Sequence, residues 1–206
     1  MERGLDYAHS APAHTAAYLE GPLLAELGPL PGTTLLDIGC GNGALTASLA
    51  ERGGAITGMD LSESGIALAR AAHPNVRFEV GSVYDDLQAR FGAFDRVIAL
   101  EVIEHLYDPR TFVRRAFEAL KPGGRFVLST PYHSYLKNLA LAVSGKLDAH
   151  FTVLWDGGHI KFFSQRTLAT VLQEAGFVDL RFQGAGRVPL LWKSLVASAR
   201  RPAELA

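Results

Sequence analysis

Residues 35–43, Leu-Leu-Asp-Ile-Gly-Cys-Gly-Asn-Gly, constrain the fold more than any other stretch of the chain. The aliphatic and β-branched residues 34–38 are typical of a buried strand, and residues 44–51 have the apolar spacing of a helix. Three glycines lie between them, and Asp37 stands near the end of the strand. A strand, a glycine turn and a helix let backbone N–H groups approach a ligand closely. The stretch therefore predicts a ligand-binding turn rather than an ordinary tight connection.

The glycine spacing is compatible with two classes of cofactor. Residues 39–44 satisfy the dinucleotide pattern G-x-G-x-x-G/A, and Asp60 lies nineteen residues after Gly41, where a ribose-binding acid is expected. Gly43, however, makes the spacing G-x-G-x-G, and Asp37 places a negative charge where a pyrophosphate would be repelled. A ligand with an ammonium and a sulfonium is therefore favoured, with a nicotinamide cofactor as a minor alternative.

Apolar segments alternate with helical segments along the middle of the chain, which predicts a parallel sheet covered on both faces. The predicted strands are residues 34–38, 55–60, 76–80, 94–100 and 125–129, followed by 177–183 and 194–200. A helix is expected over residues 14–27, and a turn over residues 121–124, Lys-Pro-Gly-Gly. Residues 1–13 lack periodicity and are expected to be mobile.

Composition limits the class of protein. One domain is expected over residues 1–206, with residues 1–32 as an N-terminal helical extension and residues 132–158 as a lid insertion. The net charge of −1 gives no support for binding nucleic acid. The lone Cys40 excludes an internal disulfide and is expected to be a small buried filler. Without a signal peptide or a long apolar run, the sequence predicts a cytoplasmic protein.

The sequence resembles the class I S-adenosylmethionine-dependent methyltransferases. The resemblance rests on Asp-x-Gly-x-Gly-x-Gly, on an acid ending the second strand, and on residues 94–98, Phe-Asp-Arg-Val-Ile, which open the fourth strand. It extends over about residues 35–200 and concerns the cofactor more than the acceptor. It implies a doubly wound, mostly parallel seven-stranded α/β sheet of Rossmann-like type, with an antiparallel last strand and a helical lid.

The resemblance also implies where S-adenosylmethionine binds, because ligands of such sheets lie beyond the carboxyl ends of the strands. Asp60 is expected to bind the ribose hydroxyls, with helix capping before Ser62 as its alternative role. The turn amides are expected to meet the methionine carboxylate, and Asp37 its ammonium. Ser82 stands where family members often carry an Asp near the adenine. The predicted cofactor-binding residues are Asp37, Gly39, Cys40, Gly41, Asp60, Leu61, Ser82, Val83 and Glu101.

A second group of polar residues, Glu-Val-Ile-Glu-His, occupies positions 101–105 after the fourth strand. In a helical turn, Glu101 faces both Glu104 and His105. Two carboxylates and an imidazole suit Mg²⁺ or Mn²⁺ before Zn²⁺, and a hydrogen-bonded cluster without metal is the alternative.

This motif resembles two metal-linked branches of the family, the ubiquinone-biosynthesis O-methyltransferases and the small-RNA 2′-O-methyltransferases. Both return a downstream histidine to the active site, and His159 fits that description, with His133 and His150 as rivals. The predicted metal ligands are Glu101, Glu104, His105 and His159, and the predicted catalytic residues are His105, His159 and Glu101.

The insertion over residues 132–156 contains an apolar helical face. That face consists of Tyr135, Leu136, Leu139, Val143 and Leu147. The ubiquinone-type enzymes carry a comparable insertion that meets membrane lipid and covers the active site, so the resemblance implies peripheral membrane contact here. A lid packed on its own domain is the alternative.

These features predict transfer of a methyl group from S-adenosylmethionine to an oxygen of a small-molecule or lipid-linked acceptor. His105 or His159 serves as the base, or a bound cation lowers the pKa of the hydroxyl; the two mechanisms compete. RNA 2′-O-methylation is an alternative that the net charge of −1 opposes. A non-catalytic module that binds the nucleoside is a further alternative.

Overall fold

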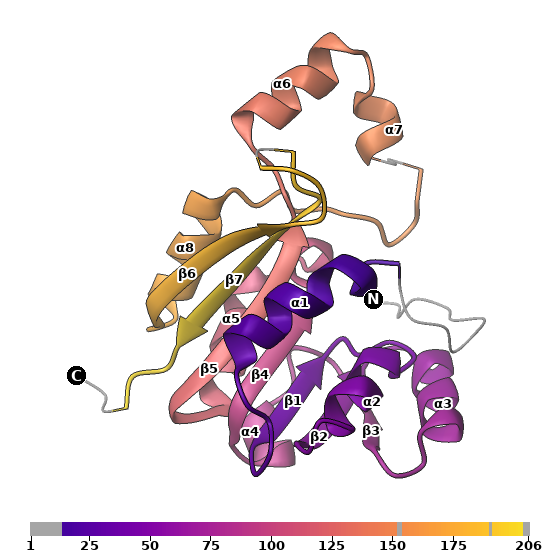
Figure 1. Cartoon of the computed structure of the whole chain (residues 1–206), viewed down its shortest axis with the longest axis vertical. Helices are drawn as coiled ribbons and strands as arrows, with labels where there is room; N and C mark the ends of the chain where they lie inside the picture. Colours follow the sequence, from indigo (N-terminus) through magenta and orange to yellow (C-terminus); the bar gives the residue numbers. More distant parts are fainter. Residues whose placement is uncertain (1–13, 152–153, 190, 204–206) are drawn as a thin grey trace.

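A seven-stranded sheet forms the middle layer of the protein, and helices cover both of its faces (Figure 1). The computed structural model describes residues 14–151, 154–189 and 191–203, so the expectation for residues 1–13 lies outside the described part. The strands are β1 (Thr34–Ile38), β2 (Ala55–Asp60), β3 (Arg77–Val80), β4 (Phe94–Leu100), β5 (Leu120–Pro131), β6 (Val178–Ala185) and β7 (Ser194–Arg200). The helices are α1 (Ala16–Leu27), α2 (Ala44–Ala50), α3 (Glu63–Ala72), α4 (Leu87–Phe91), α5 (Pro109–Glu118), α6 (Tyr135–Val143), α7 (Leu147–Phe151) and α8 (Gln165–Glu174), with a 3₁₀ turn η1 (Ile103–His105).

The strand order is β3-β2-β1-β4-β5-β7-β6. The first five strands run parallel to one another, and β7 runs antiparallel to both β5 and β6. The predicted fold class is therefore confirmed, including the antiparallel last strand. The order reverses beside β1, and the glycine turn after β1 lies at this switch point, where ligands of open α/β sheets bind.

The start of β5 differs from its prediction. Residues 121–124 were expected to form a turn, but β5 begins at Leu120, which pairs with Phe94. The register shifts between Phe94 and Arg96, and Gly123 has a left-handed φ of 79°. The Pro-Gly-Gly sequence is thus accommodated as an irregularity inside the strand.

Two apolar layers hold the sheet. On one face, α1 buries Leu19, Leu23 and Leu27 against the sheet. On the other face, α5 and α8 bury Phe112 and Leu168 in the larger cluster. Burial of such side chains stabilises a fold by about 1.5–3 kcal/mol each, so both layers fix the strand ends from which the site is built.

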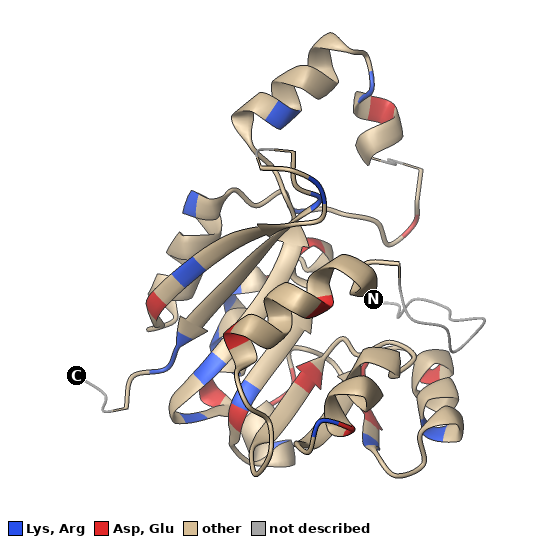
Figure 2. Ribbon diagram, viewed as in Figure 1, with Lys and Arg blue, Asp and Glu red and all other residues tan. Residues whose placement is uncertain are grey.

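The insertion after β5 projects from the body as the two helices α6 and α7, here called the lid (Figure 1). Neither helix buries a residue. The predicted apolar face is largely open, with Tyr135 81% and Val143 82% exposed. Few charged residues lie on the two helices (Figure 2). In the ranges that the structure describes, no helix combines the length and the hydropathy needed to cross a bilayer.

Candidate functional site

The glycine turn after β1 requires glycine for steric reasons. Gly39, Gly41 and Gly43 have φ values of 80°, 54° and 77°, a region that other residues rarely adopt. A Cβ atom at Gly39 would overlap the side chain of Val102, and one at Gly43 would lie 2.6 Å from the ring of Phe78. The turn therefore packs closely on its protein side, and the N–H of Gly39 donates to the Met59 carbonyl at 2.8 Å rather than pointing to a ligand.

Asp60 is held at the end of β2 by two backbone amides. Gly41 and Ser62 each donate an N–H to one of its carboxylate oxygens at 2.8 Å. The Ser62 side chain, not Asp60, caps α3 by accepting from the N–H of Gly65. Burial raises the pKa of Asp60, and the two amides oppose that rise. Each oxygen keeps a second lone pair, so a diol can still be bound by both.

Asp37 is only 3% exposed at the end of β1. Its Oδ2 accepts a 2.6 Å hydrogen bond from the Thr46 hydroxyl of α2. Burial raises the pKa of Asp37 to about 7, and the negative charge of Asp60 contributes to the rise. A positive group beside this carboxyl would return it to the charged form. The Asp37 carboxyl thus suits the ammonium of S-adenosylmethionine, which it would stabilise by its charge from the protein side of the turn.

The remaining residues predicted for the cofactor lie on the loops around the turn. Ser82 accepts from the N–H of Tyr84 at 3.3 Å and donates its own N–H to Asp85 at 3.1 Å. Val83 packs against the core. Cys40 is partly buried against Phe78 and neighbouring residues, as a small filler is expected to be. Burial also raises the pKa of the Cys40 thiol, which disfavours a reactive thiolate.

Glu101 departs from the predicted helical turn. Its backbone is left-handed, with φ of 55°, and η1 covers only Ile103–His105. Ser129 of β5 accounts for this, because its hydroxyl donates to Glu101 Oε1 at 2.7 Å while the Glu101 N–H donates to the Ser129 carbonyl. The expectation that Glu101, Glu104 and His105 share one helical face is therefore wrong.

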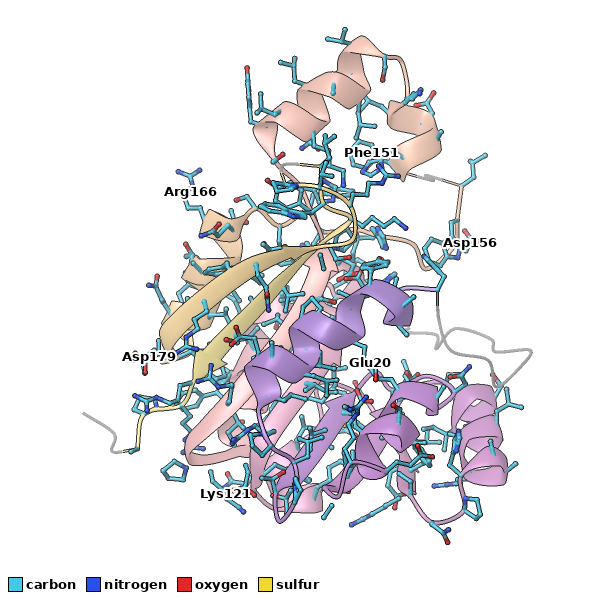
Figure 3. All side chains as sticks on the ribbon, viewed as in Figure 1. Glu20, Lys121, Phe151, Asp156, Arg166 and Asp179 are labelled. Carbon is cyan, nitrogen blue, oxygen red and sulfur yellow. The ribbon has the colours of Figure 1, made fainter. Side chains whose placement is uncertain are left out.

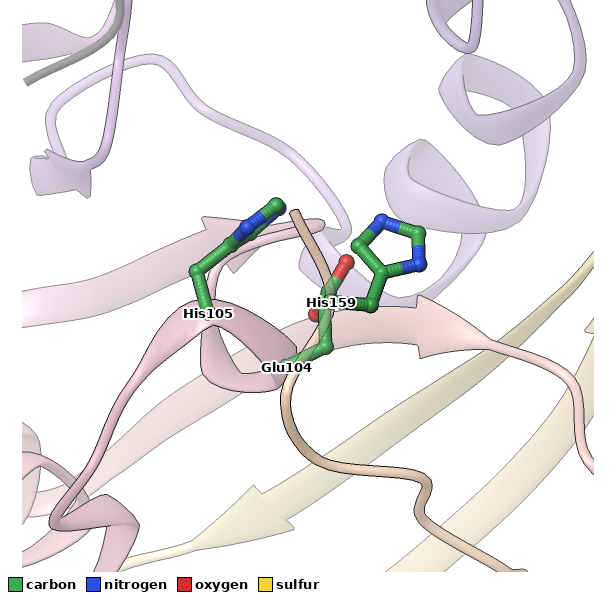
Figure 4. Close-up of side chains that lie close together, drawn as sticks. All are labelled: Glu104, His105 and His159. Carbon is green, nitrogen blue, oxygen red and sulfur yellow. The ribbon is translucent and has the colours of Figure 1, made fainter. Parts of the chain in front are cut away.

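Three of the four predicted metal ligands do converge. Glu104, His105 and His159 each offer a ligand atom within 4.8 Å of the others (Figure 4). His159 reaches this place because the N–H groups of Ile160 and Lys161 donate to the Glu104 carbonyl at 2.9 and 3.0 Å. The two imidazole rings lie 4.9 Å apart between centroids.

The burial and hydrogen bonding of Glu104, His105 and His159 suit the binding of a cation. Glu104 has no exposed surface, and in the part of the chain that the structure describes neither carboxylate oxygen has a hydrogen-bond partner. Burial raises the pKa of Glu104 well above its usual value and lowers the pKa of His159 to about 4. His105 Nδ1 lies 2.8 Å from the Gly157 carbonyl, which can only accept, so Nε2 carries the free lone pair.

The donor set differs from the predicted one because Glu101 lies outside it. Two imidazole nitrogens and one carboxylate oxygen fit a borderline divalent ion, so the preference moves from Mg²⁺ toward Mn²⁺ or Zn²⁺. The unpartnered oxygens of Glu104 support such a group, since buried carboxylates are otherwise hydrogen-bonded. The rival histidines lie in a different aromatic cluster, in which His133 follows β5 and His150 belongs to α7 of the lid, with ring centroids 5.8 Å apart.

Sequence reasoning missed Tyr18 and Ser194. The Tyr18 hydroxyl of α1 lies 3.3 Å from the Ser194 hydroxyl of β7. Ser194 in turn lowers the pKa of Glu101 by hydrogen bonding, against the larger rise that burial causes. These residues are 176 positions apart, so no local pattern indicates the contact.

Comparison with known sequences identifies relatives. The family model described as a methyltransferase domain matches residues 11–181. The chain is 36% identical over 169 residues to the ubiquinone biosynthesis O-methyltransferase of Methylobacterium sp. strain 4-46, which covers 79% of this chain and 66% of that protein. It is 32% identical over 162 residues to the protein of the same name from Hydrogenovibrio crunogenus, covering 77% and 67%. The match thus spans about two thirds of the length of these curated relatives.

Comparison with solved structures agrees on the fold. The magnesium protoporphyrin IX methyltransferase of Synechocystis PCC 6803, with bound S-adenosylhomocysteine, has a TM-score of 0.67 at 22% identity, over 87% of this chain and 79% of that chain. The YcgJ protein of Bacillus subtilis has a TM-score of 0.70 at 16% identity, over 88% and 97%.

Proposed function

The chain belongs to the S-adenosylmethionine-dependent methyltransferase family, and from that premise we propose that it methylates a hydroxyl oxygen of a small-molecule or lipid-linked acceptor. The observation that carries the proposal is the group of Glu104, His105 and His159 beyond the carboxyl end of β4, the strand that pairs with β1. The curated relatives named above are O-methyltransferases of ubiquinone biosynthesis, which supports a hydroxyl acceptor.

The cofactor is held by the residues at the ends of the first three strands. When bound, S-adenosylmethionine supplies an electrophilic methyl group on a sulfonium. Asp60 binds the ribose diol and Asp37 balances the ammonium. The N–H groups of Gly39 and Gly41 donate to the Met59 carbonyl and to Asp60, so they shape the turn around the ligand. These contacts position the methyl group, which is the main task of an enzyme for an in-line displacement.

The acceptor hydroxyl must lose a proton, and the three-residue group offers two ways to assist. The His105 ring is held by the hydrogen bond between Nδ1 and the Gly157 carbonyl. Its Nε2 therefore has a free lone pair that can accept the proton. Alternatively, Glu104, His105 and His159 would hold a divalent ion, which would supply Lewis acidity toward the hydroxyl oxygen. A base histidine cannot also be a ligand, so the two versions exclude each other.

The proposal is tested by transfer of labelled methyl from S-adenosylmethionine to catechols, with and without a chelator. If the ion is required, chelation abolishes turnover and Mn²⁺ or Mg²⁺ restores it, whereas a histidine base gives chelator-resistant turnover. In either case His159→Ala or His105→Ala lowers kcat far more than cofactor affinity. Full activity of both variants in chelator would contradict both versions.

Metal binding has a readout that does not depend on turnover. Calorimetric titration of Mn²⁺ into the apo protein is expected to show one site that Glu104→Gln and His159→Ala each weaken. Glu79→Gln is a matched control, because Glu79 lies on β3 and pairs with Arg70 and Arg77 at the surface. Equal Mn²⁺ affinity in Glu104→Gln and in the control would show that Glu104 is not a metal ligand and would contradict the metal version of the proposal.

The proposal includes contact of the lid with lipid, which would deliver a lipid-linked acceptor. Its support is the exposed apolar face of α6, where Tyr135 and Val143 are joined by Leu136 and Leu139, 58% and 46% exposed. Co-sedimentation with phosphatidylcholine vesicles is expected for the unmodified chain and reduced in Leu139→Ser. Val178→Ser, which changes an exposed apolar residue of β6, is the control. Equal sedimentation of all three chains would leave the lid without a lipid role.

A further inference from the structure

An indole ring lies against the two histidines of the candidate group. The ring centroid of Trp155 is 5.9 Å from that of His105 and 5.8 Å from that of His159, both within the range of aromatic contacts. The two imidazoles are themselves 4.9 Å apart, so each of the three rings contacts the other two. The interplanar angles of 83° and 63° are those of edge contacts, and no ring among the described residues stacks parallel on the indole. Trp155 thus borders the candidate base without a stacked partner of its own.

The backbone turn that orients His105 also positions the indole. Within residues 155–158, the N–H of Gly158 donates to the Trp155 carbonyl at 2.9 Å, and Gly157 has a left-handed φ of 79°. The Gly157 carbonyl of this turn accepts from His105 Nδ1 at 2.8 Å. A Cβ atom at Gly158 would lie 2.9 Å from the Trp155 carbonyl oxygen and 3.3 Å from its ring atom Cε3, so only glycine lets the ring lie this close. One short segment therefore sets the spacing between the indole and the candidate base.

Exposure alone assigns no role to Trp155, because single apolar residues are common on protein surfaces. Its neighbour Leu154 is 94% exposed and is such a residue. Trp155 is 47% exposed, and none of the core clusters formed by the described residues includes it. Its ring contacts are instead with two imidazoles that are themselves only partly buried. The accessible parts of the three rings therefore adjoin, which distinguishes Trp155 from an isolated surface residue.

The turn belongs to the segment that returns from the lid to the body of the protein, where Figure 3 labels Asp156. Residues 154–157 are all exposed, so a ligand can approach this segment from solvent. An indole offers a large, flat apolar face, and aromatic side chains stack on other rings with centroids about 4.5–7 Å apart. A ring stacked at that distance brings a hydroxyl that it carries toward His105 Nε2, because the indole and the His105 ring are 5.9 Å apart.

We propose that Trp155 selects the methyl acceptor by stacking on the six-membered ring that carries the methylated hydroxyl. The inference deepens the proposed function and rests on it for the identity of the histidine group as the reacting centre. A ring buries its own apolar face and the open face of the indole together, and this burial is favourable. An aromatic ring and the C–H face of a sugar ring share this property, whereas an open-chain hydroxyl compound has no flat face to offer.

Binding to the protein saturated with S-adenosylhomocysteine tests this without turnover. Calorimetry compares two vicinal diols on a six-membered ring, catechol and methyl β-glucopyranoside, with the open-chain diol butane-2,3-diol. At least one ring compound is expected to bind at least about tenfold more tightly than butane-2,3-diol, equivalent to about 1.4 kcal/mol. The ring compound that binds more tightly identifies the acceptor ring as aromatic or saturated.

Variants assign the preference to the indole. Trp155→Ala is expected to bring the ratio of ring to open-chain affinity close to one, whereas Trp155→Tyr, which keeps an aromatic face, retains it. Leu154→Ala is the matched control, because Leu154 is the exposed apolar neighbour of Trp155. For an acceptor that is methylated, Trp155→Ala is expected to raise KM about tenfold and to change kcat less than about twofold, the reverse of the effect of His105→Ala. Thermal unfolding of each variant establishes that it is folded.

Tryptophan fluorescence reports the stacking directly. The chain contains two tryptophans, so Trp192→Phe leaves Trp155 as the only one. In that variant, the ring compound is expected to change the emission of Trp155 with the dissociation constant that calorimetry gives, and butane-2,3-diol is not.

Equal affinity for ring and open-chain diols, or no measurable binding of either ring compound, overturns the proposal. A ring preference that survives in Trp155→Ala, or Trp155 emission that stays constant while the ring compound binds, overturns it as well. These outcomes are separable from failure of the proposed function. Methyl transfer to a hydroxyl with the same KM in Trp155→Ala removes this inference alone. Ring binding that depends on Trp155, with no methyl transfer to any hydroxyl, keeps the stacking surface and removes the O-methyltransferase activity.

Discussion

Asp37 and Asp60 end neighbouring strands, yet the protein holds them in different ways. Asp60 receives two backbone amides, whereas Asp37 receives one hydroxyl and is almost entirely buried. Both carboxyl groups are thus prepared for a ligand at a cost in the free energy of folding, because burial disfavours their charged forms. Single substitutions at Asp37 and Asp60 separate the contribution to ligand binding from the cost in folding stability.

The apo protein is expected to become less stable as pH rises from about 4 to about 7, in part because of Asp37. The pKa of Asp37 is raised from its ordinary value of 3.8 to about 7 in the folded protein, so the folded state binds the proton more tightly than the unfolded chain does. The stability from that proton is complete below pH 4 and is lost as pH rises through 7. Asp37→Asn keeps a neutral group beside Thr46, so its thermal unfolding is expected to vary less with pH. Parallel pH profiles of the two proteins would contradict this.

Asp60→Ala is expected to weaken S-adenosylmethionine binding by about 2–4 kcal/mol, because a charge-assisted contact to the ribose is lost. It also leaves the amides of Gly41 and Ser62 without their acceptor, so a loss of stability of about 1–3 kcal/mol accompanies it. Calorimetry and thermal unfolding measure the two effects. Glu63→Ala, an exposed acid in the first turn of α3, is the control. Unchanged cofactor affinity in Asp60→Ala would remove Asp60 from the site.

The sequence was sufficient to locate single residues and insufficient to orient all of them. Spacing indicated Asp60 at the end of β2, and the resemblance indicated His159 far from His105 along the chain. Glu101 was misplaced because helical spacing was assumed, whereas a hydroxyl 28 positions later, on Ser129, holds its side chain. Such a contact between adjacent strands follows from sheet register, which no local pattern encodes.

At the scale of elements, the lid differs from every other helical part of the protein. α1 and α6 are both apolar, but α1 buries three leucines and α6 buries none. The sequence indicated a helix in each case and an apolar face in the insertion, but periodicity reports which residues share a face and not what that face meets. The same limit left lid packing and lipid contact as open alternatives.

We expect backbone amides of α6 and α7 to exchange hydrogen faster than those of the five parallel strands and faster than those of α1. The physical reason is that local opening of the lid exposes little apolar surface. Exchange in the lid is expected to slow when S-adenosylhomocysteine and a catechol are both bound. Hydrogen exchange read by mass spectrometry measures this. Protection of the lid equal to that of α1 in the apo protein would make it a fixed element.

At the scale of the whole molecule, alternation of strands and helices was enough to predict the parallel part of the sheet. It was not enough to place the last strands, because the position of β7 between β5 and β6 depends on contacts between distant segments. β7 forms seven register pairs with β5, from Arg125↔Arg200 to Pro131↔Ser194. The resemblance, rather than the pattern of residues, supplied the antiparallel ending.

The position of β7 has a consequence for the protein while it is being made. Translation delivers the strands of the cofactor crevice first and β7 after both of its neighbours, so β6 leaves the ribosome without a partner and β5 with an open edge. Unpaired edges of this kind are templates for aggregation. The unfinished chain is thus the form most in need of a chaperone, and a chain released after residue 193 is expected to precipitate where one released after residue 203 stays in solution.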